Sequence, residues 1–219
     1  MSGNESTRER LRRRRAIVES GYDRMAESYL ASKLPLTPDI EALLQRMLDD
    51  LPPDAPLLDL GCGAGLPVTR WLAERHPVTG VDLSARQLEL ARTHVPSGVF
   101  IRADMTEVDF PGGTFGGVLA LHAIIHVPRE KHSSLLRRIH GWLRPGGHFL
   151  ATWPLSAWEG EETNWSGWGA PMWWSHFGAE TYADLLQQAG FSIEIAETLR
   201  TQDETWRWIL ARSAVRDGG

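Results

Sequence analysis

Residues 57–72 read LLDLGCGAGLPVTRWL. An apolar run that includes Asp59 ends at Gly61, and two further glycines, Gly63 and Gly65, follow at alternate positions before a helical pattern begins. Glycine adopts backbone conformations that a Cβ forbids, and it lets the main chain approach a bound molecule closely. The stretch therefore predicts a strand and a helix joined by a sharp turn that faces a ligand.

Strands and helices are predicted to alternate along the rest of the chain. Apolar runs of strand length lie at residues 56–60, 78–82, 98–102, 117–122 and 147–152. Between several of them, apolar residues recur three and four positions apart, as on one face of a helix. Two alternating segments, 191–200 and 204–213, predict a closing antiparallel hairpin. We therefore expect a doubly wound α/β sheet that is preceded by one or two helices.

Composition limits the class of protein. The chain has 219 residues, of which 42% are hydrophobic, which suits one substantial core and a single domain. No apolar run approaches the roughly eighteen residues of a membrane span, and the N-terminus is polar, so we expect a cytoplasmic protein without a membrane partner. The net charge of −5 disfavours nucleic acid as the main partner. Cys62 is the single cysteine, and no grouping of histidines and cysteines predicts a metal site.

The N-terminal segment Arg8–Arg15, RERLRRRR, departs from this acidic balance with six arginines and one glutamate. We interpret it as the solvated and partly frayed start of a first helix. The alternative is a contact with an anion, such as a nucleic-acid anchor.

An acidic residue at the end of the second predicted strand helps to define the ligand. Asp82 follows Gly61 by 21 residues. In a doubly wound sheet, ligands bind at the carboxyl ends of the strands, and a carboxylate there suits the hydroxyls of a ribose. The glycine spacing does not fit the GxGxxG pattern of dinucleotide enzymes, because Leu66 occupies the third glycine position. We therefore expect an adenosine-like ligand other than NAD.

Several motifs together resemble the class I S-adenosylmethionine-dependent methyltransferases. They are DLGCGAG at 59–65, VDLS at 81–84, RADM at 102–105 and LRPGG at 143–147. The segment YDRMAESY at 22–29 is similar to the helical lid of these enzymes, and the resemblance extends to about Arg212. It implies a Rossmann-like, mostly parallel seven-stranded sheet with an antiparallel edge strand and N-terminal helices. Other details are similar to a branch of small bacterial methyltransferases whose substrates are mostly unassigned.

The resemblance implies one methyltransferase domain over residues 1–219. Its parts are an N-terminal helical lid, a cofactor-binding core, a tryptophan-rich flap on the substrate side, and a C-terminal helix with the edge hairpin. In that order, these parts are expected at residues 1–50, 51–153, 154–178 and 179–212.

The resemblance also implies that S-adenosylmethionine is the cofactor. Asp82 would accept the ribose hydroxyls with Leu83 against the adenine, while Asp104 and the Met105 amide would meet the adenine ring. The remaining implied contacts are Tyr22, Tyr29, Asp59, Gly61, Gly63, Gly65 and His122. Structural alternatives exist for the acids, which also stabilise turns, and for the tyrosines, which also suit a core.

Methyl transfer requires mainly that a nucleophile is held in the correct orientation near the sulfonium methyl group. A hydroxyl or a protonated amine must also lose a proton, and histidine is a natural base at neutral pH. His122 and His126, near the end of the fourth strand, are candidate catalytic bases, and His176 is a further candidate. The alternative is that these rings bond backbone groups or cap a helix. The histidines expected to face solvent are His132, His140 and His148.

Tryptophans are concentrated late in the chain. Of ten in all, six lie within residues 153–174, after the fifth strand. This segment would hang over the substrate side of the fold, so its indole rings suit the wall of an apolar, aromatic or cationic substrate site. The predicted substrate contacts are Trp153, Trp173, Trp174 and His176. The alternative is a flap that packs on itself, and its three glutamates disfavour an anionic substrate.

These features predict a methyltransferase that moves a methyl group to an O or N atom of a small, partly apolar or aromatic acceptor. Two alternatives stay open: a nucleic-acid or protein methyltransferase anchored by the arginine segment, and a protein that binds S-adenosylmethionine without methyl transfer. The identity of the acceptor and the oligomeric state, monomer or homodimer, do not follow from the sequence.

Overall fold

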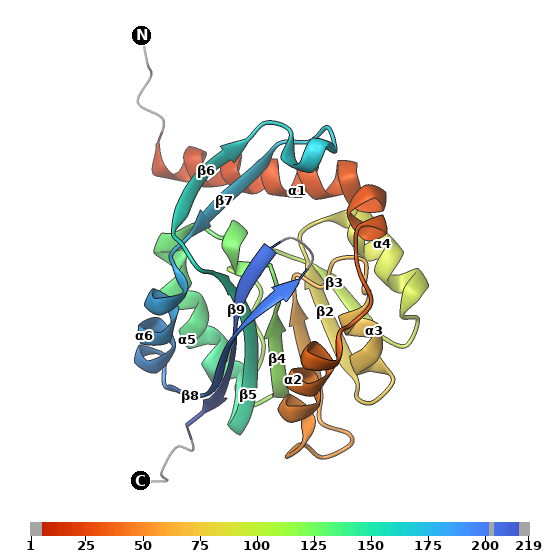
Figure 1. Cartoon of the computed structure of the whole chain (residues 1–219), viewed down its shortest axis with the longest axis vertical. Helices are drawn as coiled ribbons and strands as arrows, with labels where there is room; N and C mark the ends of the chain where they lie inside the picture. Colours follow the sequence, from red (N-terminus) through yellow and green to blue (C-terminus); the bar gives the residue numbers. More distant parts are fainter. Residues whose placement is uncertain (1–5, 202–203, 215–219) are drawn as a thin grey trace.

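A computed structural model (Figure 1) describes residues 6–201 and 204–214 of the protein. Two helices come first, α1 (Thr7–Ala31) and α2 (Pro38–Leu48). The alternating part that follows comprises β1 (Leu57–Leu60), α3 (Val68–Ala73), β2 (Val78–Asp82), α4 (Ala85–His94), β3 (Val99–Arg102), β4 (Phe115–Ala120), α5 (His132–Trp142) and β5 (Leu143–Pro154). The C-terminal part comprises β6 (Trp158–Glu162), β7 (Met172–His176), α6 (Ala179–Gln188), β8 (Phe191–Thr201) and β9 (Glu204–Ser213). Short 3-10 turns lie at Ile124–His126, Arg129–Lys131 and Trp165–Gly167.

Seven strands form one sheet in the order β3-β2-β1-β4-β5-β9-β8. The five strands from β3 to β5 are parallel, and β9 runs antiparallel to both β5 and β8. The strand order reverses between β1 and β4, which makes a doubly wound sheet with a crevice at their carboxyl ends. The predicted Rossmann-like α/β fold, with its antiparallel edge and N-terminal helices, is confirmed.

Two strand boundaries differ from the prediction. β4 ends at Ala120, two residues earlier than expected, so His122 lies in the loop beyond the strand. β5 begins at Leu143 and continues through the predicted turn at 145–147, with a shift in its register opposite β4. The difference in β5 lies at Gly146 and Gly147, which interrupt the apolar pattern that marks a strand.

Local sequence signals explain where the helices begin. Ser6 and Glu9 form a capping box at the start of α1. Thr37 and Ser84 accept backbone N–H groups at the N-termini of α2 and α4. One buried cluster packs α5 and α6 on the sheet, and another packs α2 and α3 on it. Because helices cover both faces, β1 and β4 are buried along their whole length.

Helix α1 lies across the top of the sheet beside the small two-stranded sheet of β6 and β7 (Figure 1). Val18 and Met25 of α1 form a buried apolar contact with Met172 of β7. Gly21 permits this close approach, because a Cβ there would lie 2.7 Å from the Pro171 carbonyl oxygen. Helix α1 and the β6–β7 flap therefore form a joint cover over the carboxyl ends of the strands.

Two of the histidines expected to face solvent, His132 and His148, are fully buried, so that prediction is wrong for them. His132 Nε2 donates to the Val127 carbonyl oxygen (2.8 Å), and Nδ1 accepts from the Tyr182 hydroxyl (2.9 Å). Burial lowers the pKa of His132 to about 4. His132 thus ties the loop after β4 to α6.

No helix among the described residues is long and apolar enough to cross a membrane. The predicted domain range 1–219 includes residues 1–5, 202–203 and 215–219, which lie outside the described residues. The division into lid, core, flap and C-terminal part stays a prediction.

Candidate functional site

Two adjoining cavities, of about 480 Å³ and 290 Å³, lie between the carboxyl ends of the strands and the cover. The residues that line both cavities are Tyr22, Tyr29, Gly61, Gly63, Leu121 and His122. The glycine turn after β1 is therefore the floor at which the two spaces meet. This is the place where a doubly wound sheet binds its ligand.

The glycine turn depends on backbone conformations that other residues rarely adopt. Gly61, Gly63 and Gly65 have φ values of 77°, 53° and 79°. A Cβ on Gly61 would lie 2.4 Å from the Cβ of Ala123, which belongs to the loop after β4. The first glycine of the motif thus allows two loops to pack together, and it keeps the floor free of side chains.

Asp82, at the end of β2, holds the turn and faces the larger cavity. Its Oδ2 accepts the Gly63 N–H and its Oδ1 accepts the Ser84 N–H, both at 2.9 Å. Burial raises the pKa of Asp82. A carboxylate accepts about four hydrogen bonds, so two positions remain for a ligand. A ribose diol would satisfy both of them.

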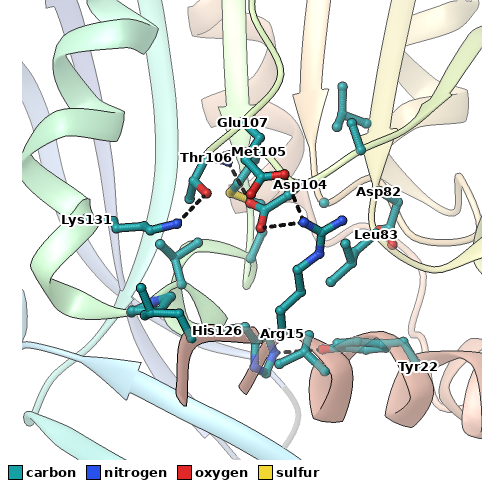
Figure 2. Close-up of a pocket in the computed structure, with 18 of the residues that line it drawn as sticks. Arg15, Tyr22, Asp82, Leu83, Asp104, Met105, Thr106, Glu107, His126 and Lys131 are labelled. Atoms are coloured by element: carbon teal, nitrogen blue, oxygen red, sulfur yellow. Dashed lines mark hydrogen bonds and ion pairs between the residues drawn. The ribbon is translucent and has the colours of Figure 1, made fainter. Parts of the chain in front are cut away.

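Asp104 and Met105, which follow β3, line the larger cavity together with Leu83. Asp104 Oδ1 accepts the Thr106 N–H at 2.8 Å, so it also stabilises a turn. Its Oδ2 lies 3.7 Å from the guanidinium of Arg15. Figure 2 shows these side chains converging on the same space as Asp82 and Tyr22. The four predicted adenosine contacts are therefore gathered in one cavity.

Asp59 is almost completely buried and lines the smaller cavity. The Thr69 hydroxyl donates to its Oδ2 at 2.7 Å. Burial raises the pKa of Asp59 to about 6. A buried carboxylate with so few donors is suited to a cationic group, which would restore its lower pKa.

His122 lies at the junction of the two cavities. Its backbone is left-handed, with φ of 54°, and its N–H donates to the Thr152 hydroxyl at 2.7 Å. Its ring meets the edge of the Trp206 ring at 4.4 Å between centroids. Burial lowers the pKa of His122 to about 3, and the positive charge of Lys33 acts in the same direction. His122 is therefore neutral near pH 7 and a weak base.

His126 bridges α1 and β7. Its Nδ1 lies 2.7 Å from the Trp173 carbonyl oxygen, so this nitrogen carries the proton and donates. Nε2 then accepts the Tyr22 hydroxyl at 2.9 Å, a pair visible in Figure 2. Burial lowers the pKa of His126 to about 4. Neither ring nitrogen is free to take a proton from an acceptor in this arrangement.

Of the four predicted substrate contacts, Trp174 lines the smaller cavity and the other three line neither of the two cavities described. Trp153 is fully buried and stacks on Tyr182 at 3.6 Å between ring centroids. Trp173 packs under the guanidinium of Arg14, and His176 is buried beside its own backbone neighbour. These three residues do not line either of the two cavities, and their role as substrate contacts stays a prediction.

The sequence reasoning missed four tryptophans that do line the smaller cavity: Trp165, Trp168, Trp206 and Trp208. Trp165 and Trp168 lie in the flap, and their rings pack on each other and on Tyr22 and Tyr29 of α1. The second pair lies on β9, which is hydrogen-bonded to β5. The signal for the β9 pair was present, since the two residues alternate and so share one face of a strand beside the site.

The arginine segment is helical from Thr7, so its interpretation as a frayed end is wrong. The residues of the segment that are exposed to solvent, as expected, include Arg8, Arg10, Arg12 and Arg13. Arg13 pairs with Glu161 at 3.3 Å, and Arg14 pairs with Glu159 at 2.9 Å. Arg15 pairs with Glu107 at 2.8 Å (Figure 2). These contacts fasten the N-terminal half of α1 to the flap and to the loop after β3.

The described residues give little support to metal-dependent or thiol chemistry. They contain no group of three or more His, Cys, Asp or Glu side chains placed to hold a metal ion. Cys62 is buried within the glycine turn, and burial raises the pKa of its thiol. A buried thiol of this kind is unreactive.

The fold and the site define an α/β protein that binds an adenosine-containing ligand at the switch point of its sheet. The chain matches the family model described as "Methyltransferase domain" over residues 30–195. The chain therefore belongs to this family, as a member of the S-adenosylmethionine-dependent methyltransferases with the class I fold.

Individual relatives agree with this membership. Phosphoethanolamine N-methyltransferase 3 from Arabidopsis thaliana is 30% identical over 154 residues, which cover 68% of this chain and 31% of that protein. The 27-O-demethylrifamycin SV methyltransferase from Amycolatopsis mediterranei is 37% identical over 98 residues, which cover 42% of this chain and 35% of that protein. The matched part thus spans about a third of the length of these relatives.

A solved structure shows the same fold. It is the 1,6-didemethyltoxoflavin-N1-methyltransferase from Burkholderia thailandensis, with 1,6-didemethyltoxoflavin and S-adenosylhomocysteine bound. The identity is 22%, the TM-score is 0.71, and the match covers 93% of this chain and 90% of that chain. At this identity the likeness concerns the fold.

Proposed function

We propose that the protein transfers a methyl group from S-adenosylmethionine to a small, partly apolar or aromatic acceptor. The observation that carries this proposal is the pair of cavities that meet at the glycine turn. One holds the acids suited to an adenosine, and the other has walls of tryptophan. The relatives named above are methyltransferases named for small molecules, which supports an acceptor of this kind.

The residues present fit the cofactor. Asp82 has acceptor positions left for a ribose, and Asp104 lies beyond Leu83 for an adenine amino group. Asp59 would receive the methionine ammonium in the smaller cavity. When bound, S-adenosylmethionine supplies an electrophilic methyl group on a sulfonium centre.

The protein's own contribution is to position the acceptor. A well-oriented reactant gains about 7–11 kcal/mol of the barrier relative to free encounter. The indole rings and His122 would form the walls that orient it, while α1 and the flap exclude water. His122 acts in this scheme as a wall and an orienting group, because its lowered pKa makes it a weak base.

The test is a calorimetric titration of the full chain with S-adenosylmethionine, in parallel with NADH. We expect binding of the sulfonium cofactor alone, followed by S-adenosylhomocysteine release with a small aromatic acceptor. Binding of NADH alone would reject the assignment of the cavity. Binding of S-adenosylmethionine without release from any of a broad set of acceptors would favour a protein that binds the cofactor for another purpose.

A nucleic-acid methyltransferase is the weaker candidate. Three of the six arginines that would form its anchor are paired with carboxylates of the protein itself. The smaller cavity is also enclosed by α1 and the flap, which suits a small acceptor better than a duplex or a strand.

A further inference from the structure

The acceptor side of the site has as many basic as acidic side chains, although the chain as a whole has a net charge of −5. Two basic side chains, Lys33 and Arg200, line the smaller cavity. Among the described residues, neither forms an ion pair with a carboxylate. The two acids that line the same cavity are Asp59, which lies beside the glycine turn, and Glu204.

Both acids have another partner. Thr69 donates to Asp59 at 2.7 Å, and the proposed function assigns this carboxylate to the ammonium of the cofactor. The Trp206 indole N–H donates to Glu204 at 3.0 Å. The two basic and two acidic side chains balance in charge, so the positive charge of the bound sulfonium cofactor makes the remaining space favour an anion.

Lys33 is placed to meet a ligand. It lies in the loop between α1 and α2, with Nζ 2.6 Å from the Tyr29 hydroxyl and 4.0 Å from the centre of the same ring. Its charge also acts on His122, which places the ammonium on the side where the two cavities meet. Two of its three N–H donors remain for a ligand.

The glutamates of the flap, which the sequence led us to expect to disfavour an anion, have partners within the protein. Glu159, Glu161 and Glu162 line neither cavity. The first two pair with Arg14 and Arg13, and Glu162 accepts the Trp174 indole N–H at 3.0 Å. The charge of Glu159 and Glu161 is thus directed toward α1, whereas Glu162 is bonded to Trp174, which lines the smaller cavity.

No histidine among the described side chains offers a free and sufficiently basic nitrogen to the acceptor space. His122 is a weak base, and both nitrogens of His126 are engaged with Tyr22 and Trp173. A protonated amine would therefore find no histidine to take its proton, and it would also be repelled by Lys33. An acceptor that is already ionised at neutral pH needs no base.

We propose that the acceptor is an aromatic or apolar carboxylic acid, bound as its carboxylate against Lys33 and Arg200, and that the product is its methyl ester. This inference rests on the proposed function and specifies its substrate class. The carboxylate oxygen forms a bond to the methyl carbon as the carbon–sulfur bond breaks. The electron pair of that bond stays on sulfur, and no proton is taken up or released. The indole rings of the cavity hold the apolar part of the acid.

The first test measures binding, so that it does not depend on finding the natural acceptor. The full chain is saturated with S-adenosylhomocysteine, and tryptophan fluorescence is followed as ligands are added. Phenylacetate and indole-3-acetate are compared with their primary amides and with phenethylamine and tryptamine. We expect the acids to bind about tenfold or more tightly than the amides, since a charge-assisted hydrogen bond contributes about 1.5–3 kcal/mol. Equal affinity of acids and amides overturns the inference.

Two variants test whether Lys33 and Arg200 bind the carboxylate of the acceptor. Lys33→Met and Arg200→Gln are each expected to reduce the acid preference by about tenfold, while affinity for the amides changes little. Arg137→Gln, which removes an equal charge from the exposed face of α5, serves as the control and should retain the preference. An unchanged acid preference in both cavity variants contradicts the inference.

The cofactor itself carries a carboxylate that could contact Lys33, and calorimetry distinguishes this contact from one with the acceptor. We expect Lys33→Met to bind S-adenosylhomocysteine as the wild type does. A large loss of that affinity with the acid preference intact would assign Lys33 to the cofactor and overturn its role here. If the wild type does not bind S-adenosylhomocysteine at all, the proposed function fails, which is a different result.

The product is the second readout. A methyl ester gains one methylene in mass and is cleaved by mild base, whereas methylated amines and phenol ethers survive that treatment. Ester formation supports the inference. Turnover of amines or phenols with no ester from any acid overturns it and leaves the methyltransferase function standing.

Discussion

At the scale of single residues, Asp82 has two tasks, since it holds the glycine turn and faces the ligand cavity. We expect Asp82→Asn to weaken S-adenosylmethionine binding about 100-fold or more, because two charge-assisted hydrogen bonds of about 1.5–3 kcal/mol each are lost. Calorimetry measures the affinity, and Asp54→Asn on the exposed surface is the control. An affinity within threefold of the wild type, about 0.7 kcal/mol, would remove Asp82 from the site.

Buried histidines make the stability of the fold depend on pH. The pKa is about 3 for His122 and about 4 for His126 and His132, below the value of 6.5 expected in the unfolded chain. The unfolded chain therefore binds protons first. Their contribution to stability is complete above pH 6.5 and is lost as the pH falls toward 4. Asp59, whose pKa is raised to about 6, offsets part of this loss.

His132 provides the test of this pH dependence. Urea unfolding at two pH values should show a smaller loss of stability for His132→Gln than for the wild type, because glutamine does not titrate. The difference expected between about pH 7.5 and about pH 5 is about 2 kcal/mol. Tyr182→Phe, which removes only the hydroxyl bonded to Nδ1, keeps the titrating ring and serves as the comparison. Parallel curves for His132→Gln and the wild type would contradict the assignment.

At the scale of elements, α1 is held over the cavities largely by charged contacts. Arg14 pairs with Glu159 at 2.9 Å and lies 4.3 Å from the centre of the Trp173 ring. We expect Arg14→Met to raise the dissociation rate of S-adenosylhomocysteine about threefold to tenfold, since such a contact contributes roughly 1 kcal/mol. Stopped-flow fluorescence measures the rate. The same rate should rise with salt in the wild type and less so in the variant.

The contact between α1 and the flap can be tested with two glycines that lie inside helices. Gly21→Ala would place a Cβ 2.7 Å from the Pro171 carbonyl oxygen, whereas Gly141→Ala in α5 meets nothing within 4 Å. We expect the first change to destabilise the fold by about 1–3 kcal/mol through overpacking. The second should stabilise it by about 0.5–1 kcal/mol, the ordinary effect of this substitution in a helix. Urea unfolding of both variants decides; stabilisation by both would mean that α1 is not closely packed on the flap.

At the scale of the whole molecule, we expect the sheet to stay folded when part of the cover formed by α1 and the flap is removed. Deleting residues 1–15 removes the paired arginines but leaves Val18 and Met25, so the sheet should remain folded by circular dichroism. The larger cavity then loses part of its wall, and S-adenosylhomocysteine should bind about tenfold more weakly. A nucleic-acid anchor would instead leave cofactor binding unchanged and abolish binding to the nucleic acid alone.

The sequence predicted the sheet and the cofactor, because those features are encoded in local patterns. Apolar runs mark the central strands, and Gly61 and Asp82 mark the turn that a strand order of this kind places at the ligand. Most tryptophans that line the smaller cavity were not predicted, since they come from β9 and from a flap without a clear period. Local sequence does not distinguish Trp153 from Trp206, yet Trp153 is buried in the core and Trp206 lines the smaller cavity.

Long-range packing also determines whether a histidine is buried or exposed. His132 lies at the start of a helix, where a polar residue is ordinarily exposed, but α6 brings Tyr182 over it. No local signal announces that contact, because it joins residues 50 positions apart.

Helix α1 is synthesised well before its partners on the flap. Arg13 and Glu161 are 148 residues apart, an interval that translation covers in roughly 7–30 s. Until then the helix has no flap to pack against, although its contacts with α4 can already form. Helix α1 therefore completes its native contacts late, and the joint cover over the strands forms only after the flap has left the ribosome.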